Sequence, residues 1–166
     1  MNKTAIIYGS TTDNTKSAAE IIKQKIGGDV ALIDVSNLKV EELNNYQNLI
    51  FGTSTWGLGD LQDDWDSFLP KLAGVDLKGK TIALFGLGDS GSYSDTYVDG
   101  MGILYEAIAG TGANLIGKVA VDGYDFDESR AVVGGEFVGL ALDEENDGDK
   151  TEERISDWVD KIKSFL

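Results

Sequence analysis

The chain has 166 residues, 42% of them hydrophobic, and its 29 acidic residues against 14 basic ones leave a net charge of −15. This length suits a single domain over residues 1–166, and the negative charge repels nucleic acid and anionic membranes while favouring basic protein partners. The absence of cysteine and histidine excludes disulfides, thiolate chemistry and the usual metal sites. With neither a membrane-spanning apolar stretch nor a signal peptide in the sequence, we expect a cytoplasmic location.

The first predicted strand, Thr4–Tyr8, continues through Gly9 into a loop of small hydroxyl and amide residues. A helix is predicted over residues 14–26, where apolar side chains recur three and four apart. A strand that turns through such a loop onto a helix N-terminus presents free backbone N–H groups and the positive end of the helix dipole to an anion. An ordinary turn with Ser and Thr as helix caps is the alternative. The candidate phosphate-binding residues are Ser10, Thr11, Thr12, Asp13, Asn14 and Thr15.

This loop differs from the P-loop of nucleotide hydrolases. That motif needs a second glycine and a lysine at the positions of Asn14 and Thr15, and Lys16 lies one residue out of frame. Because residues 10–15 include no Lys or Arg, hydrogen-bond donors alone would neutralise a bound dianion. Each such charge-assisted bond is worth roughly 1.5–3 kcal/mol.

The remaining chain alternates between predicted strands and helices. Further strands are predicted at residues 30–34, 48–52, 81–86 and 115–121. Further helices are predicted at residues 41–44, 64–73, 99–109 and 151–166. The strands are almost continuously apolar, as in a parallel sheet with helices on both faces. The pattern therefore predicts a doubly wound α/β fold, in which ligands bind beyond the carboxyl ends of the strands.

Two glycine-rich loops follow the third and fourth predicted strands, so we expect them at the same edge as the phosphate loop. Residues 53–60 contain Trp56 and residues 86–95 contain Tyr93, in positions that core packing does not explain. Two aromatic rings beside a phosphate loop are suited to sandwiching a flat ring. A planar ring joined to a phosphate monoester describes a mononucleotide.

These loops resemble those of the flavodoxin family, specifically its long-chain type, and the resemblance covers essentially the whole chain. Residues 10–15 resemble the family's phosphate loop, while residues 53–61 and 86–93 resemble the loops that carry its inner and outer ring-stacking residues. Residues 122–126 and 137–143 resemble the insertion of long-chain members. The resemblance implies a flavodoxin-like, doubly wound five-stranded parallel sheet, with an insertion splitting the fifth strand, and a non-covalently bound FMN.

The resemblance also implies how the chain uses FMN. The implied function is a low-potential one-electron carrier that works between the neutral semiquinone and the hydroquinone. On reduction, the Gly57–Leu58 peptide is expected to turn its carbonyl toward the flavin N5–H, because glycine tolerates positive φ. No catalytic residue and no metal ligand is expected. Beyond the phosphate loop, the candidate cofactor-binding residues are Ser54, Thr55, Trp56, Gly57, Leu58, Leu87, Gly88, Asp89, Tyr93 and Asp99.

Two positions depart from the family's pattern. Asp13 stands where the family usually has glycine. At about 6 Å and an effective dielectric of about 20, its charge would cost roughly 3 kcal/mol per phosphate charge. We therefore expect the Asp13 side chain to point to solvent while its N–H faces the phosphate. Glu145 replaces an aspartate that some relatives have near the flavin, and it is a further candidate contact.

Two other functions compete with the carrier. A flavodoxin-like, FMN-dependent NAD(P)H:quinone oxidoreductase needs a substrate pocket over the flavin, where Tyr93 is expected to lie. A phosphoacceptor signalling domain needs acidic residues at strand ends where this chain has Gly9-Ser10 and Thr53-Ser54. As a carrier, the protein is expected to be a monomer. It would form weak, salt-sensitive complexes with basic redox partners, a reductase as donor and a low-potential acceptor.

Overall fold

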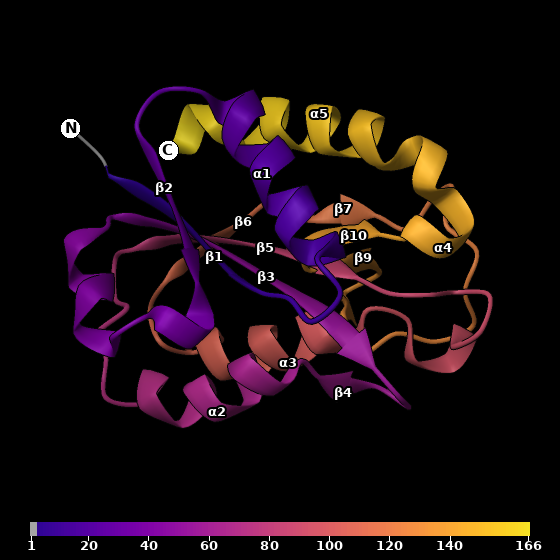
Figure 1. Ribbon diagram of the computed structural model, residues 1–166, viewed down its shortest axis with the longest axis horizontal. Helices are drawn as coiled ribbons and strands as arrows, with labels where there is room; N and C mark the ends of the chain where they lie inside the picture. The colour runs from indigo at the N-terminus through magenta and orange to yellow at the C-terminus, as the bar shows by residue number, and fades with distance from the viewer. Residues whose placement is uncertain (1–2) are drawn as a thin grey trace.

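The computed structural model describes residues 3–166 and has a central sheet with helices on both faces (Figure 1). The pairings that link the five strands of the main path are all parallel. This arrangement confirms the predicted doubly wound α/β fold. In spatial order these strands are β10 (Leu140–Leu142), β5 (Thr81–Leu87), β3 (Asn48–Trp56), β1 (Thr4–Gly9) and β2 (Val30–Asp34).

The helices cover the two faces in pairs. Successive side chains of a strand point to opposite faces, so neighbouring residues of β1 enter different cores. Ile6 joins the core beneath α1 and α5, whereas Ile7 joins the core that contains Trp65 of α2. The first pair is α1 (Asn14–Ile26) and α5 (Thr151–Ile162), and the second is α2 (Asp63–Leu72) and α3 (Asp99–Ile108) (Figure 1).

The fifth strand position is filled by two separate segments, as predicted. β6 (Asn114–Ile116) pairs with residues 81–83 of β5, and β10 pairs with residues 85–87. The chain between them carries a small antiparallel sheet of β7 (Val119–Ala120), β9 (Glu136–Phe137) and β8 (Val132–Val133).

Several predicted boundaries were wrong. The strand expected over residues 115–121 breaks at Gly117, where φ is 86° and the carbonyl accepts a hydrogen bond from Trp158 Nε1 at 2.8 Å. The last helix ends at Ile162 and continues as a 3-10 turn, Lys163–Phe165. The helix expected at residues 41–44 is a 3-10 helix, Val40–Asn45. The other 3-10 turns are Val35–Asn37, Ser94–Thr96 and Gly148–Lys150.

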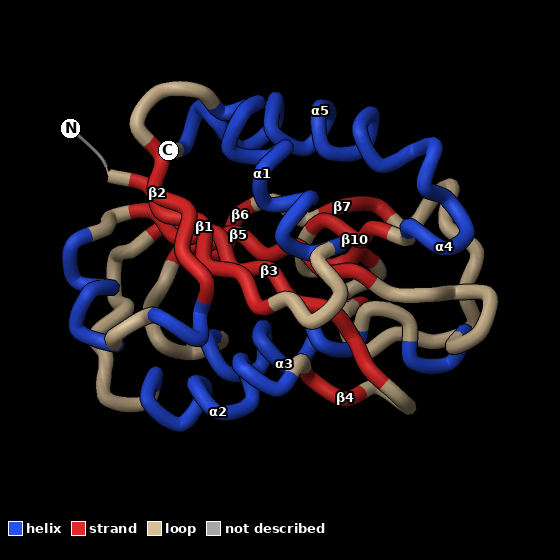
Figure 2. The backbone as a smooth tube through the Cα atoms, in the orientation of Figure 1, coloured by secondary structure: helices blue, strands red, loops and turns tan. Residues whose placement is uncertain are grey.

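The loops that follow β1, β3 and β5 gather at one end of the sheet (Figure 2). β3 extends beyond its predicted end at Gly52 to Trp56, because its last residues pair antiparallel with β4 (Asp60–Leu61). The short helix α4 (Glu144–Asp147) follows β10 at the same end. Among residues 3–166, none of the helices has both the length and the apolar character needed to cross a membrane.

Candidate cofactor site

The loop between β1 and α1 presents a row of free backbone donors. The Lys16 N–H donates to Ser10 Oγ at 3.4 Å and the Ser17 N–H donates to the Asp13 carbonyl at 2.9 Å. The N–H groups of residues 11–15 have no acceptor within the described chain. The helix also has no acidic residue in its first turn and no side-chain cap bond at its N-cap. The loop therefore leaves these N–H groups free to receive an anion.

Asp13 is the N-cap of α1 and has left-handed backbone angles, φ 68° and ψ −5°. Aspartate tolerates this region better than most residues, although glycine adopts it at no cost. Asp13 is exposed, as expected for a side chain that points to solvent. Solvent screens its carboxylate, but the charge stays at the edge of a loop suited to anions.

The inner aromatic residue lies at the end of β3, where the chain turns back into β4. The Gly59 N–H donates to the Trp56 carbonyl at 3.2 Å, and Gly57 within this turn has a φ of 51°. Trp56 is 39% exposed, and its Nε1 donates to Ser54 Oγ at 2.9 Å, which fixes the plane of the ring. The Gly100 N–H of α3 donates to Thr55 Oγ1 at 2.8 Å and supports the hairpin from below.

The outer aromatic residue, Tyr93, follows β5 and is 43% exposed. Its N–H donates to the Asp89 carbonyl at 2.9 Å. Partial burial raises the pKa of the Asp89 carboxyl, but hydrogen bonds from Asn146 and Ser92 outweigh that effect and leave the pKa below its ordinary value. Asp89 therefore carries its charge at neutral pH at the wall of the site.

The three loops enclose a cavity of about 190 Å³ at the carboxyl edge of the sheet. Trp56 and Tyr93 both line it, and so does the phosphate loop through Thr12 and Asn14. The structure thus brings together most of the residues that the sequence pointed to. The remaining predicted residues that line the cavity are Ser54, Thr55, Gly57, Leu87, Gly88 and Asp89.

Some predicted residues lie elsewhere. Leu58 is 84% exposed at the tip of the hairpin and does not line the cavity. Asp99 lies at the start of α3, where its Oδ1 accepts the Arg130 N–H at 2.7 Å, and it borders a different depression. Partial burial raises the pKa of Asp99 more than the hydrogen bond from the Arg130 N–H and the charge of Arg130 lower it. Within the phosphate loop, Ser10, Thr11, Asp13 and Thr15 shape the turn without lining the cavity.

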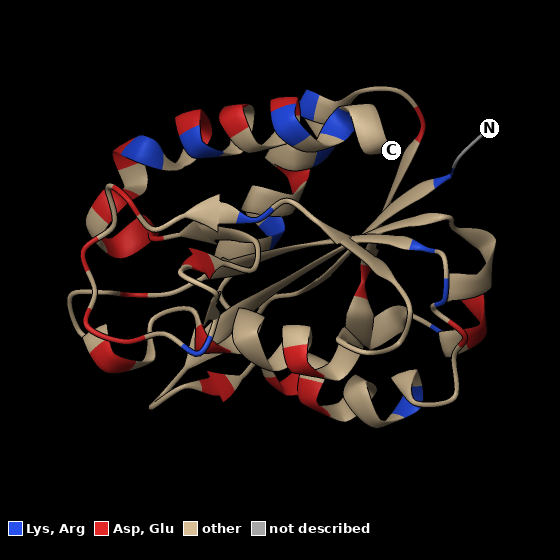
Figure 3. Cartoon of the chain, turned by 180° about the vertical axis from the view of Figure 1, so that it is seen from behind, with Lys and Arg blue, Asp and Glu red and all other residues tan. Residues whose placement is uncertain are grey.

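Acidic side chains of α4 form part of the same cavity wall. Glu145 was a candidate from the sequence, whereas Glu144 was not anticipated. The only signal for Glu144 was its place directly after an apolar strand, which holds for many loop residues. Around this end of the molecule, acidic residues outnumber basic ones (Figure 3). The cavity therefore combines a loop of donors for an anion with a negatively charged rim.

The comparisons with known proteins agree on one family. Residues 6–158 match the family described as flavodoxin. The chain is 46% identical to a Synechocystis sp. flavodoxin over 100% of its length and 99% of that protein, and 47% identical to a Nostoc sp. flavodoxin over 98% and 96%. A Fusobacterium nucleatum flavodoxin, solved bound to flavin mononucleotide, has a TM-score of 0.95 and 32% identity, covering 100% of this chain and 99% of that one. The chain belongs to the flavodoxin family.

Proposed function

We propose that this chain is a one-electron carrier that binds FMN non-covalently in the cavity between Trp56 and Tyr93. One observation carries the proposal: two half-exposed rings flank a cavity that ends at a row of free N–H groups. The Fusobacterium nucleatum flavodoxin, which is bound to flavin mononucleotide, has the same fold at a TM-score of 0.95. A phosphate requires the donors and a flat ring requires the aromatic walls, so the residues present fit FMN.

Each part of the site would hold a different part of the cofactor. The N–H groups of residues 11–15 would receive the phosphate, with the hydroxyl of Thr12 beside them. Trp56 and Tyr93 would cover the two faces of the ring and exclude water from it. Backbone groups of residues 55–57 and 87–89 line the cavity and would bond the polar edge of the ring. When bound, FMN supplies the one-electron redox chemistry.

The acidic wall would set the potential at which the protein works. Asp89, Glu144 and Glu145 line the cavity, and their negative charge opposes the arrival of an electron. About 1.4 kcal/mol of repulsion corresponds to about 59 mV for a one-electron couple. Two or three kcal/mol would therefore lower the potential by about 100 mV, which suits a low-potential donor.

We further propose that the chain is a long-chain flavodoxin, because an insertion with its own small sheet separates β6 from β10. Residues 1–166 would act as one FMN-binding domain, a monomer in the cytoplasm. Its partners would be basic redox proteins, a reductase donor and a low-potential acceptor, in weak complexes. A quinone oxidoreductase is not favoured, because Tyr93 stands where a second substrate would stack on the ring.

A visible spectrum recorded during stepwise anaerobic reduction tests this function. We expect the purified protein to be yellow, to pass through a long-wavelength absorbing form at the one-electron stage, and then to bleach. It should not oxidise NADPH unless a separate reductase is added. A colourless protein that leaves the fluorescence of added FMN unchanged would overturn the proposal.

A further inference from the structure

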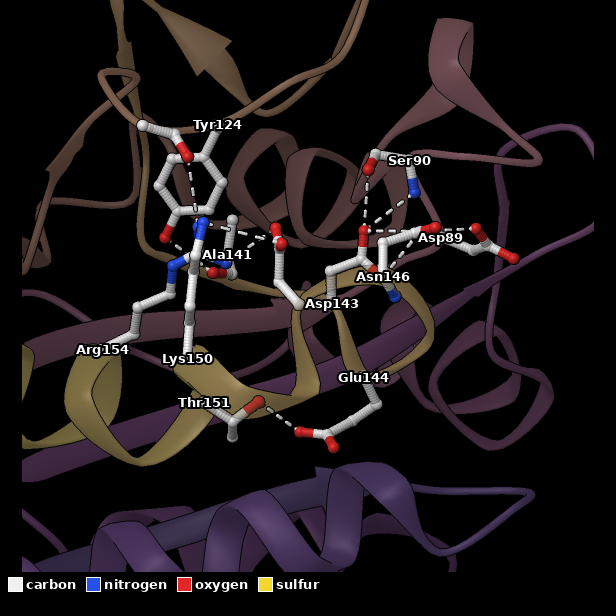
Figure 4. Close-up of polar contacts among 12 residues, drawn as sticks. Asp89, Ser90, Tyr124, Ala141, Asp143, Glu144, Asn146, Lys150, Thr151 and Arg154 are labelled. Carbon is white, nitrogen blue, oxygen red and sulfur yellow. Dashed lines mark hydrogen bonds and ion pairs between the residues drawn. The ribbon is translucent and has the colours of Figure 1, made fainter.

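The outer loop of the site, residues 88–93, is attached to the rest of the molecule mainly by side chains from the segment after β10. Its backbone contributes one bond to the last residue of β10, from the Gly88 N–H to the Leu142 carbonyl at 3.0 Å. Asp143, only 1% exposed, accepts two bonds from Ser90 through Oδ2: from the Ser90 N–H at 3.0 Å and the Ser90 hydroxyl at 2.8 Å (Figure 4). A buried carboxylate with two donors from one residue holds that residue firmly.

A second side chain from the same segment, that of Asn146, holds the loop at Asp89, the residue before Ser90. Asn146 Nδ2 donates to Asp89 Oδ1 at 2.8 Å (Figure 4). The same oxygen accepts the Ser92 N–H at 3.0 Å. Asn146 also packs beneath Gly91, where an added Cβ would lie 2.5 Å from Asn146 Oδ1. The loop therefore fits Asn146 by shape as well as by hydrogen bonding.

Asp143 and Asn146 together form a clamp on the outer loop, and this clamp is itself held in place. Asp143 Oδ1 accepts the Asn146 N–H at 3.0 Å, so the two clamp residues hold each other. The hydroxyl of Thr151, the first residue of α5, donates to the Glu144 carboxylate. Because α5 packs on the sheet, these contacts hold the outer loop at a fixed position relative to the sheet.

We propose that Asp143 and Asn146 are positioning residues that hold Tyr93 at the distance from Trp56 that a flavin ring requires. Neither residue lines the cavity, so neither acts on the cofactor directly. They act through Asp89, whose side chain Asn146 holds and whose carbonyl accepts the Tyr93 N–H at 2.9 Å. This inference rests on the proposed binding of FMN. It means that residues outside the cavity determine how tightly the flavin ring binds.

The informative variant is Asp143→Asn. The amide oxygen of asparagine still caps α4, but its NH₂ group then faces the Ser90 N–H, so a donor meets a donor. The matched control is Asp147→Asn, which makes the same chemical change in the same short helix. Asp147 bonds Lys150 and Arg154 and makes no contact with residues 88–93 in these hydrogen-bond and ion-pair networks.

Three ligands separate positioning from general damage: FMN, riboflavin and inorganic phosphate, each titrated into the apoprotein. Asp143→Asn should weaken the binding of FMN and of riboflavin by the same factor, about tenfold or more, and leave the binding of phosphate unchanged. Asn146→Ala should have a smaller effect in the same direction, because Asn146 is exposed and water replaces its bond. Asp147→Asn should match the wild type for all three ligands.

Amide hydrogen exchange of Ser90 and Ser92 in the apoprotein gives a readout that needs no flavin, and both should exchange faster in Asp143→Asn. Unchanged riboflavin affinity, or an equal loss for phosphate, would overturn the proposal. If Asp143→Asn does not fold, Ser90→Ala tests the contact from the half-buried loop side, because it removes the hydroxyl that donates to Asp143 Oδ2 at 2.8 Å. A wild-type protein that binds no flavin would refute the proposed function, whereas flavin binding that Asp143→Asn leaves intact refutes only the clamp.

Discussion

At the scale of single residues, Asp13 is where the demands of the backbone and of charge conflict. Its left-handed conformation suits glycine, and its carboxylate lies at the edge of a loop whose free N–H groups suit a phosphate. The repulsion between this carboxylate and a phosphate charge would be roughly 3 kcal/mol at an effective dielectric of about 20. Exposure to water and salt reduces it toward about 1 kcal/mol. We therefore expect the side chain to weaken the site that its own backbone helps to form.

Replacing this residue should tighten FMN binding. Asp13→Gly removes both the charge and the backbone strain, and Asp13→Asn removes the charge while keeping a residue that tolerates positive φ. We expect about a fivefold gain in affinity for Asp13→Asn at low salt and a larger gain for Asp13→Gly. Fluorescence titrations at low and high salt measure this. Equal affinities for wild type and Asp13→Asn at low salt would show that the charge has no effect.

Asp99 should affect stability rather than cofactor binding. Burial raises its pKa above the ordinary value of 3.8, so the folded state holds the proton more tightly than the unfolded state. The corresponding stability is present at low pH and is lost as the pH rises through the raised pKa. Asp99→Asn keeps an acceptor for the Arg130 N–H and removes the buried charge.

We therefore expect Asp99→Asn to melt at a higher temperature than wild type at pH 7 and at nearly the same temperature near pH 3, where the wild-type carboxyl is largely protonated. FMN affinity should be unchanged, because Asp99 does not line the cavity. Thermal denaturation across this pH range measures the effect. A variant that is less stable at pH 7 would contradict this account.

The missed residue Glu144 and the wrongly included residue Asp99 share a physical reason. Trp56 and Tyr93 were identifiable because an aromatic residue in a glycine-rich loop has no packing role. Glu144 carried no such signal, since its place in the wall depends on how α4 is held against the outer loop. Asp99 follows the outer loop closely in sequence, but its side chain turns to Arg130 of the insertion. Only the folded chain decides such directions.

At the scale of elements, the β3–β4 hairpin carries the conformational freedom of the site. Gly57 has a φ of 51°, and an added Cβ would lie 3.2 Å from Asp60 Oδ2. A β-branched residue at positive φ costs about 1–2 kcal/mol or more. A side chain at this position would therefore restrict the Gly57–Leu58 peptide that is expected to rotate on reduction.

Gly57→Val should bring the two one-electron potentials of bound FMN closer together, by about 50 mV or more, given about 59 mV for each 1.4 kcal/mol. Gly110→Val is the matched control, because Gly110 also has positive φ, 81°, and nothing lies within 4 Å of its added Cβ. Potentiometric titration of both variants checks the prediction. If the two show the same separation of potentials, rotation of this peptide is not what separates them.

The order of strands and helices was predictable because apolar runs and helical periodicity depend on residues close together in the sequence. The residues at which these elements end were harder to predict. β3 extends to Trp56 because β4 pairs with it, and the run expected at residues 115–121 divides at Gly117 because Trp158 bonds its carbonyl. Each boundary depends on a contact with a segment that comes later in the chain. Pairing between segments, rather than local propensity, therefore decides where these strands end.

At the scale of the whole molecule, charge is unevenly distributed along the strand direction. Acidic residues concentrate at the end that holds the site (Figure 3). Lysines occupy the last turns of α1, α2 and α5, which return to the opposite end of the sheet. The field of such a molecule would turn its site toward a basic partner before contact.

Removing one charge at each end tests this orientation. Asp60→Asn at the site end should slow reduction by a basic reductase about twofold at low salt, with the difference vanishing at high salt. Asp29→Asn, the same change at an exposed position after α1, should have no effect. Stopped-flow rates over a range of ionic strength measure both. Equal slowing by the two variants would mean that net charge alone matters.

The split fifth strand has a consequence for the time at which the site is completed. β6 pairs only with the half of β5 that is remote from the cavity, and β10 closes the half beside it. During synthesis the chain must therefore pass through residues 117–139 before the wall near Gly88 can form, and α5 must follow to fix α4. A nascent chain that ends before residue 140 has both aromatic residues but no finished site. The cofactor would therefore find a complete site only after β10, α4 and α5 have been made.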